Sequence, residues 1–178
     1  MKNTKALTIV DLRQGYLDWD EIYQSMLPHL FNYFLYRTGD EAIAQDLSGT
    51  TFERAWSNKL HYRADLASVQ AWMFGIARNV FREYLRELRR NASTVVPFEP
   101  ENLQSDHFDR DRTDTKILLK RFLGVLPEKE QELVALKYGA GLNNREIAKL
   151  LHLSESNVGT RLFRTVESLR KKMEVDNE

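Results

Sequence analysis

The chain has 178 residues, of which 42% are hydrophobic, and this is enough material for one ordinary domain or two small ones. Lys plus Arg and Asp plus Glu each number 26, so any nucleic-acid surface must come from the distribution of charge rather than from bulk basicity. The absence of cysteine excludes disulfides, thiolate zinc sites and cysteine nucleophiles, and it fits a reducing compartment, so a cytoplasmic location is the default expectation. We expect no cofactor and no metal. No run of 18 apolar residues is present, so we expect no membrane insertion.

The first module is predicted to be helical and to occupy residues 1–91, beginning with a loose N-terminal arm. Apolar residues recur with a helical period of 3.6, and glycine-punctuated alternating strands are absent. We expect long helices over 20–37, 40–56 and 71–90, with a short helical piece near Ser68. Four aromatic residues at helical spacings, which we expect to be mainly core, are Phe52, Trp56, Trp72 and Phe74.

The helix expected over 71–90 is strongly amphipathic. Its apolar arc runs from Trp72 through Val80 to Leu88, and the opposite arc carries Arg78, Asn79, Arg82, Arg86, Arg89 and Arg90. An arginine-rich face suits a nucleic-acid backbone, although a solvated face with Glu and Arg pairs at helical spacing has the same pattern. The polar stretch ahead of it contains Tyr62, which could hold an unstacked base. His61 has no metal-ligand partner at useful spacing.

Residues 92–113 are predicted to form an acidic, flexible linker. Helical periodicity stops there, and Pro97 and Pro100 appear. From Glu99 to Asp114 the sequence holds six acidic residues and two arginines, which gives a local charge of about −4. About 22 residues span up to roughly 75 Å when extended. That length bridges two duplex sites about 16 base pairs apart, or about 54 Å. In the free chain the two modules could instead pack together.

The second module, residues 114–178, is predicted to contain four helices, over 114–123, 127–137, 144–151 and 155–172. Asn143 followed by Glu146 forms a capping-box pattern, and Ser154 can cap the next helix. Between them an apolar set with small Ala148 allows two helices to cross closely. Residues expected to point inward are Ile147, Ala148, Leu151, Leu153, Val158, Leu162 and Val166. This spacing indicates a helix-turn-helix that binds DNA.

The second helix of that unit presents polar and cationic side chains suited to a major groove. From Arg161 to Lys172 five cations accompany Glu167, which suits attraction to phosphates, although basic helix ends also complement the helix dipole. The candidate contacts are Glu155, Ser156, Asn157, Thr160, Arg161 and Arg164. His152 stands where a glycine often makes the turn, so its backbone is expected to need the left-handed conformation.

Taken together, the motifs resemble those of bacterial sigma factors, in their order and spacing and over nearly the whole chain. The matching segments are Asp46-Leu47, Thr51 to Trp56, Trp72 to Asn79, Leu126-Pro127 and Leu142 to Ser154. The size and the direct linker are similar to the extracytoplasmic-function (ECF) group. The resemblance implies an all-α fold of two small helical domains and a function in transcription initiation, with no catalysis.

The resemblance also implies partners and site residues. The first domain would bind the clamp of the largest subunit of core RNA polymerase and open the minus-ten promoter element; the second would read the minus-35 element. Residues that would face polymerase are Asp46, Glu53 and Arg54. Residues that would hold the minus-ten base and single strand are Tyr62, Arg63, Asp65, Asn79, Arg82 and Arg86. Residues that would meet the minus-35 duplex are Ser156, Asn157, Thr160, Arg161 and Arg164. Many relatives also have an anti-sigma factor, and this sequence leaves that partner open.

Besides His152, the chain departs from the family pattern at three positions. Gly49 and Thr50 stand where a Gln and a Glu usually follow Asp-Leu, which predicts a weaker or redistributed polymerase contact, and a mid-helix glycine costs about 1 kcal/mol. Gly159 replaces a common Lys or Arg and removes one phosphate contact.

Two other classes of function compete with this interpretation. A stand-alone DNA-binding regulator would use its N-terminal module to sense a ligand or to dimerise. Such a regulator would give no function to the cationic face over 78–90. An enzyme would need a convergent set of His, Cys, Ser or paired carboxylates. Four scattered histidines, no cysteine and no glycine-rich phosphate loop disfavour the enzyme.

Overall fold

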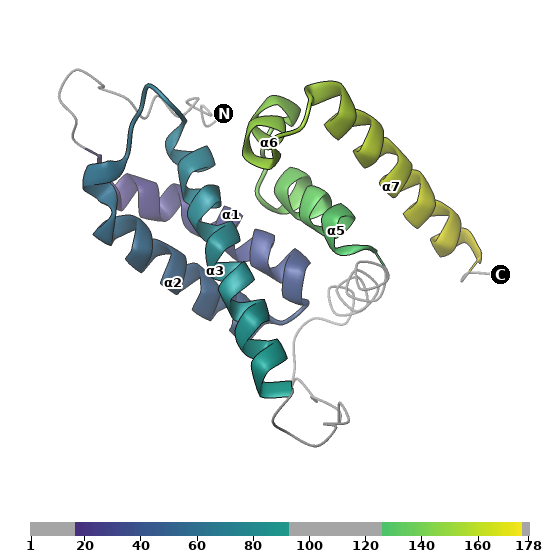
Figure 1. Cartoon of the computed structure of the whole chain (residues 1–178), viewed down its shortest axis with the longest axis horizontal. Helices are drawn as coiled ribbons and strands as arrows, with labels where there is room; N and C mark the ends of the chain where they lie inside the picture. Colours follow the sequence, from purple (N-terminus) through teal and green to yellow (C-terminus); the bar gives the residue numbers. More distant parts are fainter. Residues whose placement is uncertain (1–16, 93–125, 176–178) are drawn as a thin grey trace, which may run out of the picture.

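The computed structural model describes residues 17–92 and 126–175, and every regular element in these ranges is helical, as predicted (Figure 1). The elements are α1 (Trp19–Thr38), α2 (Glu41–Ser57), η1 (Lys59–His61), α3 (Val69–Ala92), α5 (Glu128–Val134), η2 (Ala135–Gly139), α6 (Asn144–Leu151) and α7 (Glu155–Val175). The helix expected over 114–123 and nearly all of the expected linker lie outside the described residues.

Capping residues set the beginning and end of α1 and the beginning of α2. The Asp18 carboxylate caps α1 by accepting from the backbone N–H groups of Asp20 and Glu21, each at 3.1 Å. Gly39 ends α1 in the left-handed conformation, with φ of 64°, and Asp40 then caps α2. This tight connection makes α1 and α2 an antiparallel pair, against which α3 packs (Figure 1).

In the second module the capping box is formed as predicted. The Asn143 side chain accepts from the Glu146 backbone N–H, and the Glu146 carboxylate accepts from the Asn143 N–H, both at 2.9 Å. His152 ends α6 with φ of 56°, which confirms the expected left-handed turn. The expected helix over 127–137 instead changes at Ala135 into the π-helical turn η2.

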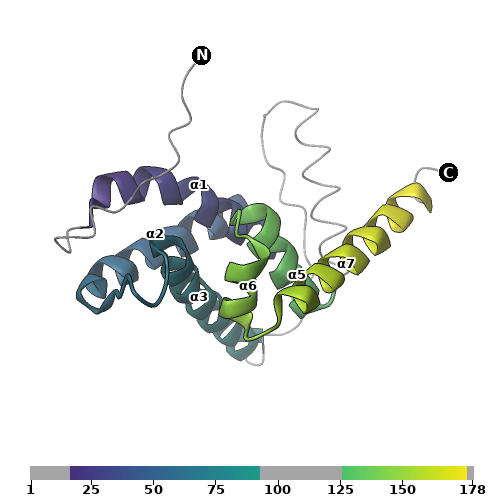
Figure 2. The same ribbon diagram turned by 90° about the horizontal axis from the view of Figure 1, so that it is seen from above.

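The two modules are packed together and share one hydrophobic core. Residues from the first module, such as Leu30 and Phe74, and residues from the second, such as Leu136 and Ile147, are fully buried in the same cluster. Two views at right angles show α5 and α6 against the first module, while α7 extends away from it (Figure 2). The outer face of α7 is therefore turned away from the shared core.

Candidate nucleic-acid interface

Helix α7 presents a polar outer face, held in place by an apolar inner one. Val158 and Leu162 are buried as expected, whereas Thr165 is buried and the expected Val166 only partly so. Ser154 caps the helix by accepting from the Asn157 N–H at 3.2 Å. Four of the five predicted minus-35 residues, Ser156, Asn157, Thr160 and Arg164, are exposed.

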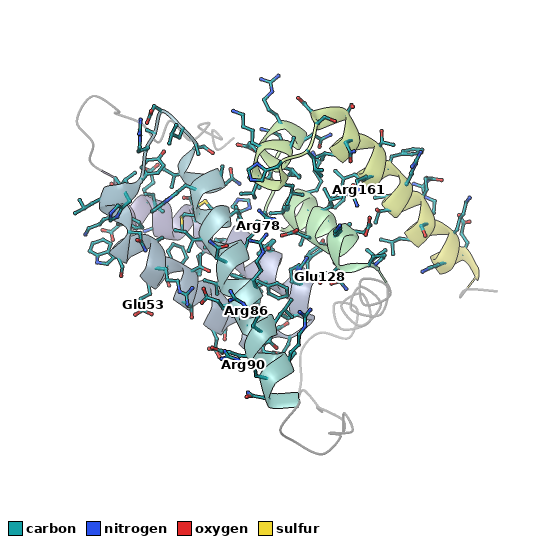
Figure 3. All side chains as sticks on the ribbon, in the orientation of Figure 1. Glu53, Arg78, Arg86, Arg90, Glu128 and Arg161 are labelled. Carbon is teal, nitrogen blue, oxygen red and sulfur yellow. The ribbon has the colours of Figure 1, made fainter. Side chains whose placement is uncertain are left out.

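Arg161 differs from these four. Its guanidinium lies 3.0 Å from the Glu130 carboxylate on α5, and its side chain is only 31% exposed (Figure 3). It sits near the boundary between the inner and outer faces of α7, where a long side chain can turn back towards its own module. To contact a phosphate, the Arg161 guanidinium would have to leave the Glu130 carboxylate and pair with the DNA backbone instead.

The segment before α3 forms a compact loop built around Tyr62. The Tyr62 hydroxyl donates to the Ala67 carbonyl at 3.0 Å, and its ring packs against Trp72 with centroids 5.1 Å apart. Arg63 and Asp65 at the loop surface form an ion pair at 2.7 Å, and the hydrogen bond from Arg63 lowers the pKa of the Asp65 carboxyl. Leu60 and Leu66 are highly exposed in this segment, and sequence reasoning had not selected them.

On α3 the predicted polar row is present and continuous. Asn79, Arg82 and Arg86 are all exposed. Arg82 donates to the Asn79 side-chain oxygen at 3.3 Å, and Arg86 donates to the Arg82 carbonyl at 3.4 Å. The loop packs through Tyr62 on Trp72, near the N-terminal end of the same helix that carries this row.

Arg78 does not belong to the exposed cationic face, and its expected place there was wrong. Its side chain is 12% exposed. The guanidinium points from α3 to α5 and α6, where it donates to Glu132 and to the Leu150 carbonyl (Figure 3). Arg82 lies only one helical turn further along α3 and is exposed, so the boundary between the exposed and the covered side of α3 runs between these two arginines.

The predicted polymerase residues lie on α2. Asp46 and Glu53 are exposed, and a Cβ atom added at Gly49 would meet nothing within 4 Å, so the row between them is open. Arg54 is tied to Glu83 of α3 at 2.6 Å. The hydrogen bond from Arg54 lowers the pKa of the Glu83 carboxyl.

An aromatic surface at the end of α2 is a feature that sequence reasoning missed. Trp56 is 51% exposed, so the expectation that it is mainly core was wrong, whereas Phe52 and Phe74 are buried. Its ring contacts Trp19 edge to face at 5.2 Å and lies 3.3 Å from the Lys59 ammonium. A helical wheel places Trp56 about 110° from the centre of the buried stripe of α2, and this signal was available in the sequence.

Among the described residues, no group of three or more His, Asp or Glu side chains could hold a metal ion. None of the helices that the structure describes is both long enough and apolar enough to cross a membrane.

Comparison with known protein families agrees with this two-part arrangement. Residues 22–91 match Sigma-70 region 2, and residues 116–169 match Sigma-70, region 4. The ECF RNA polymerase sigma factor SigL of Mycobacterium tuberculosis (strain ATCC 25618 / H37Rv) is 30% identical over 152 residues, 84% of this chain and 85% of its own. The ECF RNA polymerase sigma factor SigM of Bacillus subtilis (strain 168) is 29% identical over 152 residues, which cover 85% of this chain and 92% of that one.

Two solved structures share the fold. One is the sigma factor RpoE in complex with the anti-sigma factor NepR from Bartonella quintana, with a TM-score of 0.68, 21% identity, and coverage of 89% of this chain and 98% of that chain. The other is CnrH in complex with the cytosolic domain of CnrY, with the same TM-score and identity and coverage of 89% and 88%.

Proposed function

The chain belongs to the sigma-70 family, as an ECF RNA polymerase sigma factor that directs transcription initiation, and we propose how its two modules divide this task. The first module binds the clamp of core polymerase and melts the minus-ten element, and the second reads the minus-35 element. The observation that carries the proposal is that α7 presents an exposed polar face while its apolar face is anchored.

The second module suits duplex DNA. The N-terminal turns of α7 offer Ser156, Asn157 and Thr160 at the surface, with Arg164 one turn further along. Hydroxyl and amide groups pair with base edges in a major groove, and an arginine pairs with a guanine or a phosphate. The cap at Ser154 and the fixed turn at His152 hold this helix rigidly against α6, which is what register on a duplex requires.

The first module suits an opened strand. The exposed row Asn79, Arg82 and Arg86 supplies hydrogen-bonding and cationic groups, and the loop of Tyr62, Arg63 and Asp65 lies ahead of it. Single-stranded sites combine a positively charged track with stacking or apolar surfaces for the bases. The Tyr62 ring is already packed on Trp72, so we propose that it forms a wall of the base site rather than a free stacking platform.

Polymerase binding falls to the exposed side of α2. Asp46 and Glu53 give this surface an acidic character, and Arg54 is held by Glu83 at one edge. We propose that the protein acts in the cytoplasm, together with RNA polymerase. We also propose that it docks on the polymerase clamp and that an anti-sigma factor is a further partner.

Two single substitutions test the division of labour in the complex with core polymerase. Arg164→Ala should lower occupancy of the minus-35 duplex, measured by footprinting. Asn79→Ala should leave the occupancy of the minus-35 duplex unchanged and should reduce melting of the minus-ten element, measured by the permanganate reactivity of its thymines.

Ser168→Ala on α7 and Leu88→Ala on α3 are the matched controls, because both positions are exposed and outside the proposed contacts. If both test variants lose duplex occupancy and melting to the same extent, the proposed division is wrong.

A further inference from the structure

Phe163 on α7 is the most exposed aromatic side chain among the described residues, with 69% of its surface accessible to solvent. Trp56, which is half-exposed on α2, packs edge to face against Trp19, whereas no other ring in the described part of the chain contacts Phe163. A single exposed apolar residue is common on protein surfaces, so its placement on the helix decides whether it has a function.

The placement of Phe163 is on the outer face of α7, among the proposed minus-35 contacts. The residues that form the buried stripe of this helix are Val158, Leu162 and Thr165. On a helical wheel Thr160 points about 165° away from the centre of that stripe. Phe163 and Arg164 lie on either side of Thr160, each about 130° from the same centre. The phenyl ring is therefore part of the face that would enter a major groove.

Gly159, one turn before Phe163, leaves the ring uncovered. A long helical side chain leans back towards the N-terminus of its helix, so the Phe163 ring lies over the turn that contains Gly159 and Thr160. A Cβ atom added at Gly159 would meet nothing closer than the Asn144 amide nitrogen, at 3.5 Å. A lysine or arginine at this position would lay its long apolar stem along the ring. With glycine, the ring stays open to a ligand.

The chemistry of this face favours a base pair over an apolar protein surface as the ligand of the ring. Ser156, Thr160 and Arg164 are exposed hydrogen-bonding residues, and Phe163 is the apolar residue among them. The centre of a protein–protein interface instead gathers several apolar and aromatic residues. In a major groove the apolar group on a base edge is the 5-methyl group of thymine, and a phenyl ring can contact it.

We propose that Phe163 recognises the 5-methyl group of a pyrimidine in the minus-35 duplex. The inference rests on the proposed function of α7 and names the chemical group that this helix recognises. In unmodified DNA the group belongs to thymine, and 5-methylcytosine carries the same group at the same place in the groove. Recognition then combines hydrogen bonds from the polar residues of the face with one apolar contact, and that contact rejects uracil and unmethylated cytosine.

The size of the effect follows from the burial of one methyl group. Removal of one methyl-sized group from water corresponds to about a fourfold gain in affinity. Loss of the ring leaves the hydrogen-bonding residues of the face in place, so the loss of discrimination is confined to the base pair that the ring contacts.

Replacement of thymine by deoxyuridine tests the contact, because it removes the methyl group and keeps every hydrogen bond of the base pair. The probe is a labelled minus-35 duplex from a promoter that the natural protein uses with core polymerase. Each thymine is replaced singly, and binding of the holoenzyme is followed by fluorescence anisotropy. With the natural protein we expect the replacement at one thymine, or at two adjacent ones, to weaken binding about fourfold.

Phe163→Ala should abolish this dependence on the methyl group. We expect it to bind the unmodified duplex about fourfold more weakly or worse, with no further loss on replacement of the sensitive thymine. At that position a duplex with 5-methylcytosine should bind the natural protein about fourfold more tightly than one with cytosine, and Phe163→Ala should bind both equally.

Tyr138→Ala is the matched control, because it removes another exposed aromatic side chain of the second module that lies on η2 rather than on α7. It should keep the full effect of deoxyuridine. Phe163→Leu keeps an apolar side chain at the same place and should retain at least a twofold effect. Both changed positions are exposed, so helix content measured by circular dichroism should equal that of the natural protein in all three variants.

Several outcomes would overturn the proposal. They are equal binding of every deoxyuridine duplex by the natural protein, an undiminished deoxyuridine effect in Phe163→Ala, or equal binding of cytosine and 5-methylcytosine by the natural protein. Weaker assembly of Phe163→Ala with core polymerase, together with an unchanged deoxyuridine effect, would place the ring at a protein interface instead. Failure of the natural holoenzyme to bind any minus-35 duplex would count against the proposed function itself, because that binding is measured before any substitution is made.

Discussion

Truncation of Arg164 to alanine gives a quantitative test of the proposed DNA-reading face of α7. The side chain is exposed on the outer face of α7 and has no ion-pair partner among the described residues, so its loss should leave the fold intact. Arg170 is a matched control, because it lies on the same helix but pairs with Glu167 at 3.3 Å.

The expected magnitude follows from counterion release. One phosphate contact contributes about 0.9 to the slope of log K against log salt. If Arg164 makes one such contact and its contribution vanishes at 1 M salt, Arg164→Ala should weaken minus-35 duplex binding about fifteenfold at 0.05 M salt and about fourfold at 0.2 M, with the slope reduced by about 0.9. At room temperature this is a loss of about 1.6 and about 0.9 kcal/mol.

The assay is a titration of labelled minus-35 duplex by holoenzyme, followed by fluorescence anisotropy at four salt concentrations. A loss of about 1–3 kcal/mol with an unchanged slope would mean that Arg164 reads a base edge rather than a phosphate. No loss at any salt, or an equal loss and slope change in Arg170→Ala, would mean that Arg164 does not contact the minus-35 duplex.

Three further predictions concern the stability of the two modules, and urea unfolding checks each. Asn143→Ala should lower the free energy of unfolding by about 1 kcal/mol, because it removes one half of the capping box. An unchanged free energy of unfolding would show that the capping box does not stabilise the protein. His152→Gly should raise it by up to about 1 kcal/mol, because relief of left-handed strain outweighs the greater freedom of glycine when unfolded; a decrease would contradict this. The folded-state pKa of Glu83 is lowered by Arg54, so the pair stabilises the protein above the ordinary glutamate pKa of 4.5 and its contribution is lost as pH falls through the lowered value. The difference in unfolding free energy between wild type and Glu83→Gln should therefore shrink below pH 4.5, and a difference that grows there would be evidence against the pair.

The helices and the exposed polar face of α7 could be predicted because their signals are local. The capping box at Asn143, the stop at His152 and the inward positions Ile147 and Val158 depend on residues within a few turns of one another. A helical period and a cap suffice to place them, and the observed ends differ from the predicted ones by at most a few residues.

The remaining features depend on contacts between distant segments. Arg78 looked like a member of a basic row because its partners, Glu132 and Leu150, come from the other module. Arg161 looked like a free DNA contact because Glu130 is 31 residues away in sequence. The π-helical turn η2 ends at Gly139, whose missing Cβ allows close approach to the backbone of α1, and no periodic pattern in the sequence predicts this turn. Tertiary packing decides all three.

Promoter-specific initiation is measured most directly by transcription in vitro from fragmented genomic DNA, with core RNA polymerase in the presence and absence of this protein. We expect new start sites that need both core polymerase and the protein, with shared sequence at two positions upstream. DNA binding by the protein alone, with no core-dependent start site at any fragment, would contradict it.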